Sequence, residues 1–199
     1  MKDLSISLLT ICGLAELEQH GSSGVTHVLS ILDPDRADPD DFAGYDRHHR
    51  TTLRFHDIIQ PMGEMILPEP KDVEAVLKFG EELTEQGPAD DAHVLVHCHM
   101  GVSRSTAAMT TLLCQLHPQA DEDEVFAHLR SIRPQIWPNS RMIGFCRCRA
   151  RQGRQADQGA GAALRPAARM EAGDRQLHGK QWPRRRSGDG PGGRLSILR

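Results

Sequence analysis

Along the first 145 residues, short apolar runs that are typical of strands alternate with stretches that have the hydrophobic period of a helix. Short apolar or β-branched runs, each bounded by turn residues, predict strands over 5–9, 25–32, 51–55 and 93–97. Stretches with helical patterning and end signals predict helices over 14–21, 72–87, 104–116 and 121–134, and another helix is expected to begin within 138–145. The polar, proline-containing stretches 33–50 and 56–70 are typical of surface connections.

This pattern ends after residue 145. Residues 147–199 contain neither Val nor Phe and have no apolar period that would pack against a core. We therefore expect a folded domain over 1–145 and a basic, disordered tail over 146–199. The abrupt change also raises the hypothesis that a shifted reading frame has replaced a natural final helix, which the codons of the neighbouring frame would test.

Charge divides the chain at the same place. Residues 1–146 hold 11 Lys and Arg against 23 Asp and Glu, whereas residues 147–199 hold 13 against 4. Because an acidic domain repels a phosphate backbone, nucleic acid is not expected as a partner. Five cysteines at scattered spacings argue against a disulfide framework and favour the cytoplasm. No apolar run is long enough to span a bilayer, and the first residues fit a strand better than an export signal, so no membrane is expected.

The stretch HCHMGVSRST, residues 97–106, combines the parts of an anion-binding nucleophilic site. Cys98 follows a predicted strand, and Arg104 opens a predicted helix whose N-terminus attracts anions. The same helix end and the guanidinium lower the pKa of a nearby thiol. Gly101 permits a tight turn, and Arg104 can grip two phosphate oxygens. The intervening loop is long enough to surround a tetrahedral anion with backbone N–H groups, and consists of His99, Met100, Gly101, Val102 and Ser103.

Other interpretations of these residues explain less. If Cys98 were a buried structural thiol, Gly101 and Arg104 would have no explanation. His97, Cys98 and His99 alternate across an extended strand, so they are poorly placed to bind one metal ion. No metal or other cofactor is therefore expected. The Ser105 hydroxyl can either serve the chemistry or bond locally at the helix start, and the sequence leaves both open.

The same stretch matches the H-C-x5-R-[ST] signature of the cysteine-dependent protein tyrosine phosphatases. The wider pattern most resembles their small dual-specificity branch, through GVTHVLSIL (24–32), LRFHDI (53–58) and IRPQIWPNSRMI (132–143). The similarity covers about residues 5–145. It implies an α/β fold with a central, mostly parallel sheet of about four to five strands flanked by helices.

The resemblance also implies a role for each matching residue. Cys98 would attack phosphorus and form a phosphocysteine, while Arg104 and the loop amides bind the phosphate. Ser105 would stabilise the departing thiolate, and His97 would brace the loop. The family's general acid is an aspartate upstream of the signature, which points to Asp57, 41 residues before Cys98. Glu64, on the same connection, is the alternative acid.

The expected substrate follows from the charge of the loop. The loop contains no lysine, which favours a singly phosphorylated substrate over a phosphoinositide. We expect a phosphatase acting on phosphotyrosine, in a phosphorylated protein or a small phosphate ester; phosphoserine and phosphothreonine stay open, and the sequence does not predict the oligomeric state. The alternatives are a non-catalytic phosphate-binding module, or pseudophosphatase, and a rhodanese-like sulfur transferase.

Overall fold

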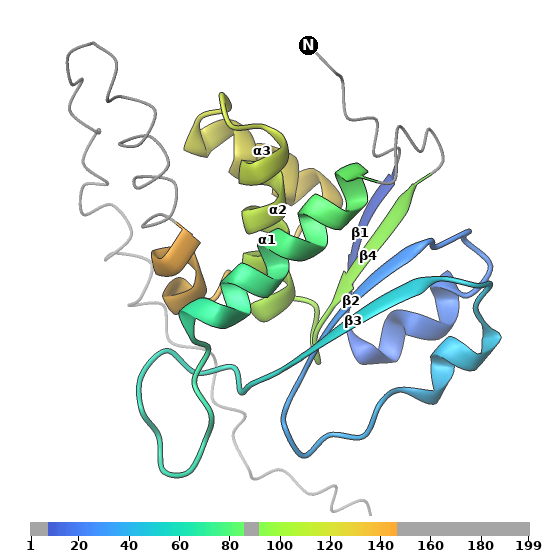
Figure 1. Cartoon of the computed structure of the whole chain (residues 1–199), viewed down its shortest axis with the longest axis horizontal. Helices are drawn as coiled ribbons and strands as arrows, with labels where there is room; N and C mark the ends of the chain where they lie inside the picture. The colour runs from blue at the N-terminus through green and yellow to red at the C-terminus, as the bar shows by residue number, and fades with distance from the viewer. Residues whose placement is uncertain (1–7, 86–91, 147–199) are drawn as a thin grey trace, which may run out of the picture. The chain divides into compact units, whose positions relative to one another are not determined.

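A parallel sheet forms the centre of the chain, which a computed structural model describes over residues 8–85 and 92–146. Four strands lie in the order β1-β4-β2-β3, and every neighbouring pair is parallel (Figure 1). They are β1 (Leu8–Cys12), β2 (His27–Leu32), β3 (His49–Arg54) and β4 (His93–His97). The predicted fold class, an α/β fold with a mostly parallel sheet, is confirmed.

Three strands differ from their predicted bounds by a few residues, and β2 begins at His27 rather than at residue 25. The first strand was expected over 5–9, but β1 continues to Cys12, because Leu8–Cys12 pairs residue by residue with His93–His97. Residues 5–7 lie outside the described residues. The strand β3 begins at His49, inside the predicted connection 33–50, because His49–Arg54 pairs along the whole of β2.

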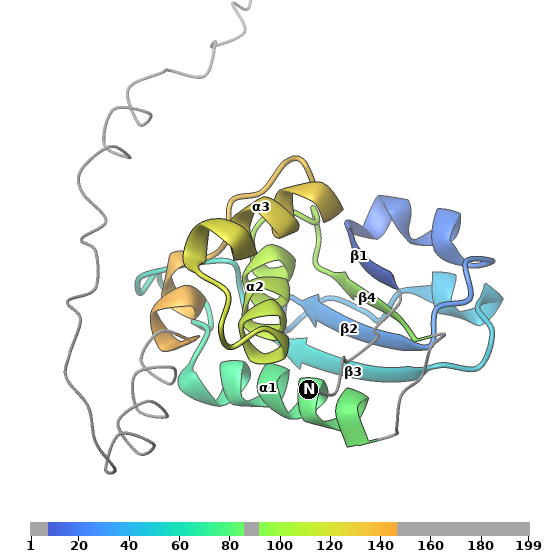
Figure 2. The ribbon, with the colours of Figure 1, turned by 90° about the horizontal axis from the view of Figure 1, so that it is seen from above.

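Helices cover both faces of the sheet (Figure 2). On one face lie α1 (Pro70–Glu85), α2 (Arg104–Leu116) and α3 (Glu122–Ile132). On the other lie two 3-10 helices, η1 (Leu14–His20) and η2 (Asp40–Gly44), the second within the predicted connection 33–50. Residues 140–146 are also helical. None of the helices in the described ranges has the length and apolar character needed to cross a membrane. The predicted tail falls almost entirely outside those ranges.

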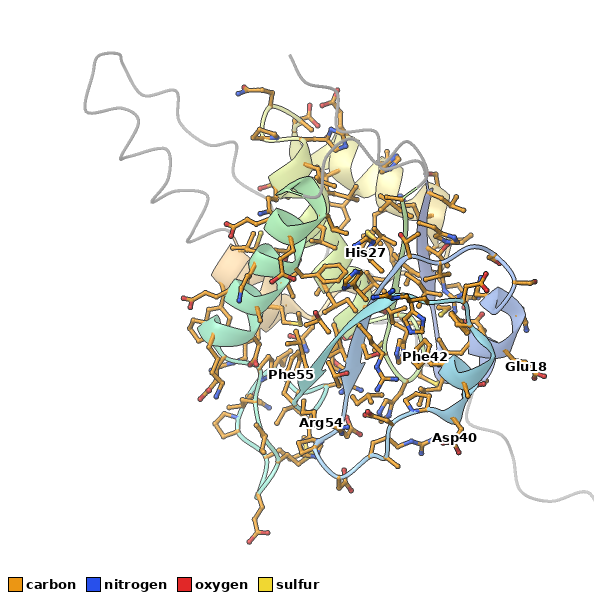
Figure 3. The ribbon with its side chains drawn as sticks, turned by 45° about the vertical axis from the view of Figure 1, so that its right-hand side comes forward. Glu18, His27, Asp40, Phe42, Arg54 and Phe55 are labelled. Carbon is orange, nitrogen blue, oxygen red and sulfur yellow. The ribbon has the colours of Figure 1, made fainter. Side chains whose placement is uncertain are left out.

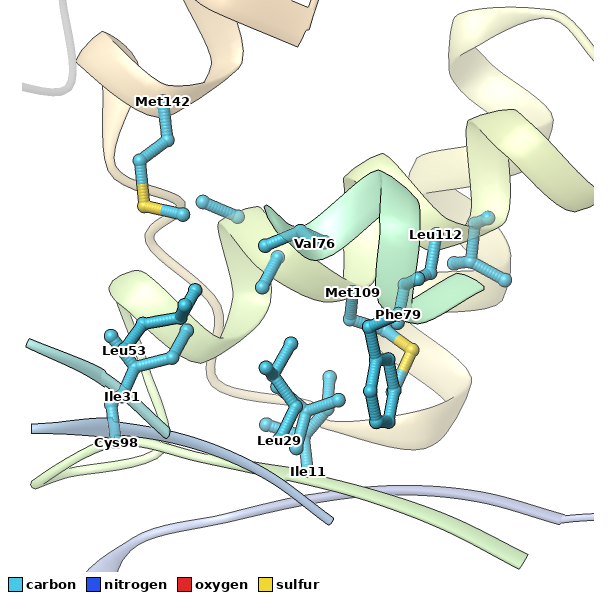
Figure 4. Packing of buried hydrophobic residues seen from close by; sticks show 14 of the residues in the cluster. Ile11, Leu29, Ile31, Leu53, Val76, Phe79, Cys98, Met109, Leu112 and Met142 are labelled. Atoms are coloured by element: carbon cyan, nitrogen blue, oxygen red, sulfur yellow. The ribbon is translucent and has the colours of Figure 1, made fainter. Parts of the chain in front are cut away.

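This two-sided cover explains why β2 is buried along its whole length and does not alternate between apolar and polar residues. All of its residues are buried, as expected for a parallel strand between two layers. The larger core cluster lies between the sheet and the α-helices and includes Leu29 and Phe79 (Figure 4). The smaller cluster packs the 3-10 helices through residues such as Phe42, while Glu18 and Asp40 of the same helices point away from the sheet (Figure 3).

The direction of the strands gathers residues from distant parts of the sequence. Because all four strands are parallel, their carboxyl ends lie at one edge of the sheet. The residues that follow these ends are Gly13, Asp33, Phe55 and Cys98. In open α/β sheets this edge is where ligands bind.

Candidate active site

The signature loop, residues 98–103, packs its backbone directly against the end of β1. Gly101 has a φ of 68°, and a Cβ at this position would lie 2.5 Å from the carbonyl carbon of Cys12. A Cβ on Gly13 would in turn lie 3.0 Å from the carbonyl oxygen of His99. The Leu14 N–H donates to that oxygen at 3.0 Å. Glycine is therefore required on both sides of this contact, which fixes the curvature of the loop.

The Cys98 thiol lies at the bottom of the loop, where the carboxyl end of β4 meets the start of α2. Its side chain belongs to the larger core cluster, and the residue is only 2% exposed (Figure 4). Burial raises the pKa of the Cys98 thiol, but hydrogen bonds from the Ser105 hydroxyl and backbone and the charge of Arg104 outweigh it, so the pKa is lowered overall. The Ser105 Oγ lies 3.2 Å from the Cys98 Sγ. The site therefore shifts Cys98 toward the thiolate, which is the nucleophilic form of a thiol.

Arg104 is held rigidly beside the loop by groups from two other strands. Its Nη1 donates to the Asp33 Oδ1 at 2.6 Å and to the Phe55 carbonyl oxygen at 2.6 Å. The guanidinium is almost completely buried, and its Nε–H has no hydrogen-bond partner among the described residues. A buried, charged donor without a partner is costly, so this N–H points to an anion as its natural ligand.

His99 contacts the same carboxylate as Arg104. The backbone N–H of Asp33 donates to His99 Nε2 at 3.3 Å, which leaves the proton of a neutral ring on Nδ1, 3.5 Å from Asp33 Oδ2. Burial, followed by the charge of Arg104, lowers the pKa of His99. The neutral ring thus links the signature loop to the end of β2 without adding a second cation to the site.

Asp57 lies in the connection after β3 and accepts two hydrogen bonds on one oxygen. The Ser103 Oγ donates to the Asp57 Oδ1 at 2.7 Å, and the Asn139 Nδ2 donates to the same atom at 2.9 Å. Asn139 is buried and also holds the backbone of the loop, because its N–H donates to the Ser103 carbonyl at 3.3 Å. The second carboxylate oxygen of Asp57 accepts no hydrogen bond from the residues that the structure describes.

The cleft above Cys98 has a volume of about 670 Å3 and is lined by the signature loop and by residues from 57–62 and 137–140. Asp57 is one of the lining residues, whereas Glu64 is exposed on the same connection and is not among them. Of the two candidate acids, only Asp57 therefore lines the same cleft as Cys98. No cluster of His, Cys, Asp or Glu within the described ranges is arranged to hold a metal ion.

His97 lies beneath the loop on the other face of the sheet. It is fully buried, its Nε2 is 2.7 Å from the Ser30 Oγ, and its ring packs on Phe42 at a centroid distance of 5.6 Å. Burial lowers the pKa of His97 to about 4, so the ring is neutral near pH 7. This placement supports a bracing role, because the side chain does not line the cleft.

Two further residues brace the outside of the loop. The Gly13 N–H donates to Glu16 Oε2 at 2.6 Å, and Arg133 Nη1 donates to Glu16 Oε1 at 2.8 Å. The Arg133 Nη2 also reaches the Met100 carbonyl oxygen at 3.4 Å. The pair thereby ties η1 and the segment after α3 to the signature loop.

Comparison with known proteins identifies the family. The family model described as protein-tyrosine phosphatase matches residues 67–148, a range that contains the whole signature loop. The chain belongs to the protein-tyrosine phosphatase family. This phosphatase-family chain is 31% identical over 134 residues to the human protein phosphatase Slingshot homolog 3, an alignment that covers 67% of the chain and 17% of that protein. The chain thus spans only about a sixth of the length of that curated relative.

Solved structures show the same fold. Human DUSP28 superimposes with a TM-score of 0.54 at 18% identity, over 75% of this chain and 94% of that one. The PTP-2 phosphatase of Cydia pomonella superimposes with a TM-score of 0.55 at 19% identity, over 74% and 90% of the two chains. At such identities the similarity concerns the architecture, which is that of tyrosine and dual-specificity phosphatases.

The structure brings most of the predicted residues of this family member together and adds others. Cys98, Arg104, Ser105 and Asp57 meet at one edge of the sheet, whereas Glu64 does not join them. Sequence reasoning missed the following supporting residues: Asp33, Asn139, Glu16 and Arg133. A signal for Asp33 was present, since it directly follows a buried strand in SILDP. Asn139 lies in the stretch 132–143 that carries the resemblance, but nothing in that stretch marks it as a partner of Asp57.

Proposed function

We propose that this chain hydrolyses phosphate monoesters, phosphotyrosine in particular, through a phosphocysteine intermediate. The observation that carries the proposal is the pairing of a thiol of lowered pKa with an unpartnered, buried guanidinium N–H. Cys98 is stabilised as the thiolate by Ser105, and the Arg104 Nε–H lacks a partner among the described residues. An anionic nucleophile beside an unsatisfied anion-binding donor suits attack on a bound phosphate.

In the first step the Cys98 thiolate attacks phosphorus and forms a P–S bond, while the P–O bond to the leaving group breaks. The departing oxygen takes a proton from Asp57. Because Asp57 Oδ1 already accepts from Ser103 and Asn139, the proton is assigned to Oδ2. Arg104 and the loop N–H groups stabilise the charge on the equatorial oxygens.

In the second step water attacks the phosphocysteine. The Asp57 carboxylate, now unprotonated, accepts a proton from this water as the P–S bond breaks. The departing Cys98 thiolate receives a hydrogen bond from the Ser105 hydroxyl, which lies 3.2 Å away. Phosphate is released and Asp57 is again protonated, so the cycle consumes one water and needs no other reactant.

The buried position of Cys98 also supports the preference for phosphotyrosine. Because only 2% of this residue is exposed, the ester has to reach inward from the surface of the cleft. A phosphorylated phenol extends further from the peptide backbone than a phosphorylated Ser or Thr, so it reaches the thiolate with less distortion of the backbone.

The test is chemical capture of the intermediate. Rapid acid quenching of a reaction with an aryl phosphate near pH 6 should give a phosphorylated peptide that contains Cys98. Cys98→Ser should lower turnover by at least about 10²-fold, because an unactivated hydroxyl is a poor nucleophile, while phosphate-ester binding is retained. Cys114→Ser, on α2 outside the cleft, is the matched control and should retain turnover. Phosphate binding without turnover in the wild type would instead identify a binding module.

A further inference from the structure

Large apolar side chains surround the cleft that leads to Cys98. Ile59 and Met62, from the connection after β3, are each 55% exposed. Met100 of the signature loop is 73% exposed, and Trp137, from the segment after α3, is 63% exposed. Three segments that are distant in sequence therefore place apolar surface around one opening. Exposed apolar surface of this kind, concentrated at a site, marks a place where a ligand binds.

Charged groups at the same opening are few and already engaged. Among the described residues, the ionisable side chains that line the cleft are Asp57, Cys98, His99 and Arg104, and none of these lining residues is a lysine. Arg104 is buried and bound to Asp33. Arg133, whose guanidinium approaches the loop from outside, is bound to Glu16. Because residues 1–146 also carry 23 acidic against 11 basic residues, the opening offers little attraction to acidic groups beside the phosphate.

We propose that this opening selects phosphoproteins in which large apolar side chains directly flank the phosphorylated residue. The proposal rests on the proposed phosphatase function and adds the local chemistry of the substrate to it. The flanking side chains would bury Met62 and Met100 while the phosphate occupies the signature loop. Methionine is flexible and polarizable, so it adapts to apolar partners of different shape rather than to one sequence.

A lipid phosphate is the main competing explanation for an apolar opening. A membrane surface that carries phosphorylated lipids is anionic and attracts clusters of Lys and Arg. Within the part of the chain that the structure describes, no lysine lines the cleft, and residues 1–146 are acidic overall. These charges favour a peptide with apolar flanks over a phosphorylated lipid.

Three phosphotyrosine peptides of equal length test the proposal. The phosphotyrosine is flanked on both sides by Leu and Met in the apolar peptide, by Ser and Gln in the neutral polar peptide, and by Asp and Glu in the acidic peptide. The kcat/KM for the apolar peptide should exceed that for the acidic peptide by about tenfold or more, the effect of removing one large apolar side chain from water. Met62→Lys and Met100→Lys should each reduce the ratio of the kcat/KM for the apolar peptide to that for the acidic peptide several-fold. Met65→Lys is the matched control, because Met65 is an exposed methionine of the same connection that does not line the cleft.

The outcomes separate this proposal from the proposed function. Turnover of a small aryl phosphate that depends on Cys98 is measured first, and its absence would count against the phosphatase itself. If that turnover is present but the three peptides react equally, the selection for apolar flanks is wrong. An equal reduction of the ratio by Met65→Lys would also overturn it, as would faster turnover of vesicles containing a phosphorylated lipid than of the apolar peptide.

Discussion

At the scale of single residues, two buried cysteines at the ends of neighbouring strands show what controls ionisation here. Cys12 ends β1, and its strand partner His97 immediately precedes Cys98. Burial, followed by the charge of Glu16, raises the pKa of Cys12 to about 12. Cys98 is buried to a similar extent, but the hydrogen bonds from Ser105 and the charge of Arg104 lower its pKa. Burial together with a nearby carboxylate therefore raises the pKa of one thiol, whereas the donors at the start of α2 lower the pKa of the other.

The first prediction concerns Ser105→Ala. Loss of the hydroxyl removes the largest of the effects that lower the pKa of Cys98, so the pH at which Cys98 becomes reactive should rise toward that of an ordinary thiol. The measurement is the rate of alkylation of Cys98 by iodoacetamide as a function of pH, read by peptide mass spectrometry. Cys12 in the same samples should stay unreactive, and Ser131→Ala, an exposed serine of α3, serves as the matched control. An unchanged curve for Ser105→Ala would mean that this hydroxyl has only a local structural role.

At the scale of elements, the site depends on a contact between two connecting segments, one after β3 and one after α3, and not on a contact between helices or strands. The connection after β3 carries Asp57, and the segment after α3 carries Asn139, which bonds both Asp57 and the backbone of Ser103. The Asn139 Oδ1 in turn accepts from the Met142 N–H at 3.2 Å, in the helical residues 140–146. The position of the proposed acid is therefore coupled to the signature loop directly, through the Ser103 hydroxyl, and indirectly, through the buried amide of Asn139.

The second prediction compares substrates that differ in their need for an acid. Asp57→Asn should lower kcat on phosphotyrosine by roughly 10²-fold, the usual contribution of general acid catalysis. Asn139→Ala should lower it by about tenfold, the effect of losing one hydrogen bond that positions Asp57. Both variants should lose much less on an aryl phosphate whose phenol leaves readily as an anion. Glu64→Gln is the matched control and should behave as the wild type. Equal losses on both esters would show that Asp57 is structural.

The sequence was sufficient for the strands, the α-helices and the signature loop, because these are encoded locally, but it missed η2, which lies within the predicted connection 33–50. The apolar runs predicted all four strands within a few residues, and the fixed spacing of Cys98, Gly101 and Arg104 predicted the loop. It was insufficient for the residues that support the loop. Arg104 and Asp33 are 71 positions apart, and Asn139 and Asp57 are 82 apart. Such pairs are determined by the order of the strands and by the path of the chain after α3, which hydrophobic periodicity does not specify.

At the scale of the whole molecule, His97 links the stability of the fold to pH. It is fully buried between the sheet and η2, where it contacts Ser30 and Phe42. Burial lowers the pKa of His97 from 6.5 to about 4. Between these two values the unfolded chain binds a proton that the folded chain does not, so the free energy of unfolding falls as the pH decreases from about 6.5 to 4.

The third prediction is the size of that loss and its dependence on one side chain. The free energy of unfolding should decrease by on the order of 3 kcal/mol across this window because of His97 alone, at about 1.4 kcal/mol for each unit of pKa difference. Urea unfolding between pH 7 and pH 4.5 measures it. His97→Gln should be less stable at pH 7 but should show a clearly flatter pH dependence, since the amide can still bond Ser30 and cannot titrate.

Some dependence of the free energy of unfolding on pH should persist in His97→Gln, because the pKa values of His20 and His99 are also lowered, by burial in each case. His128→Gln, at an exposed position of α3, should leave the slope unchanged. An equal slope in His97→Gln and the wild type would show that acid sensitivity arises elsewhere in the chain.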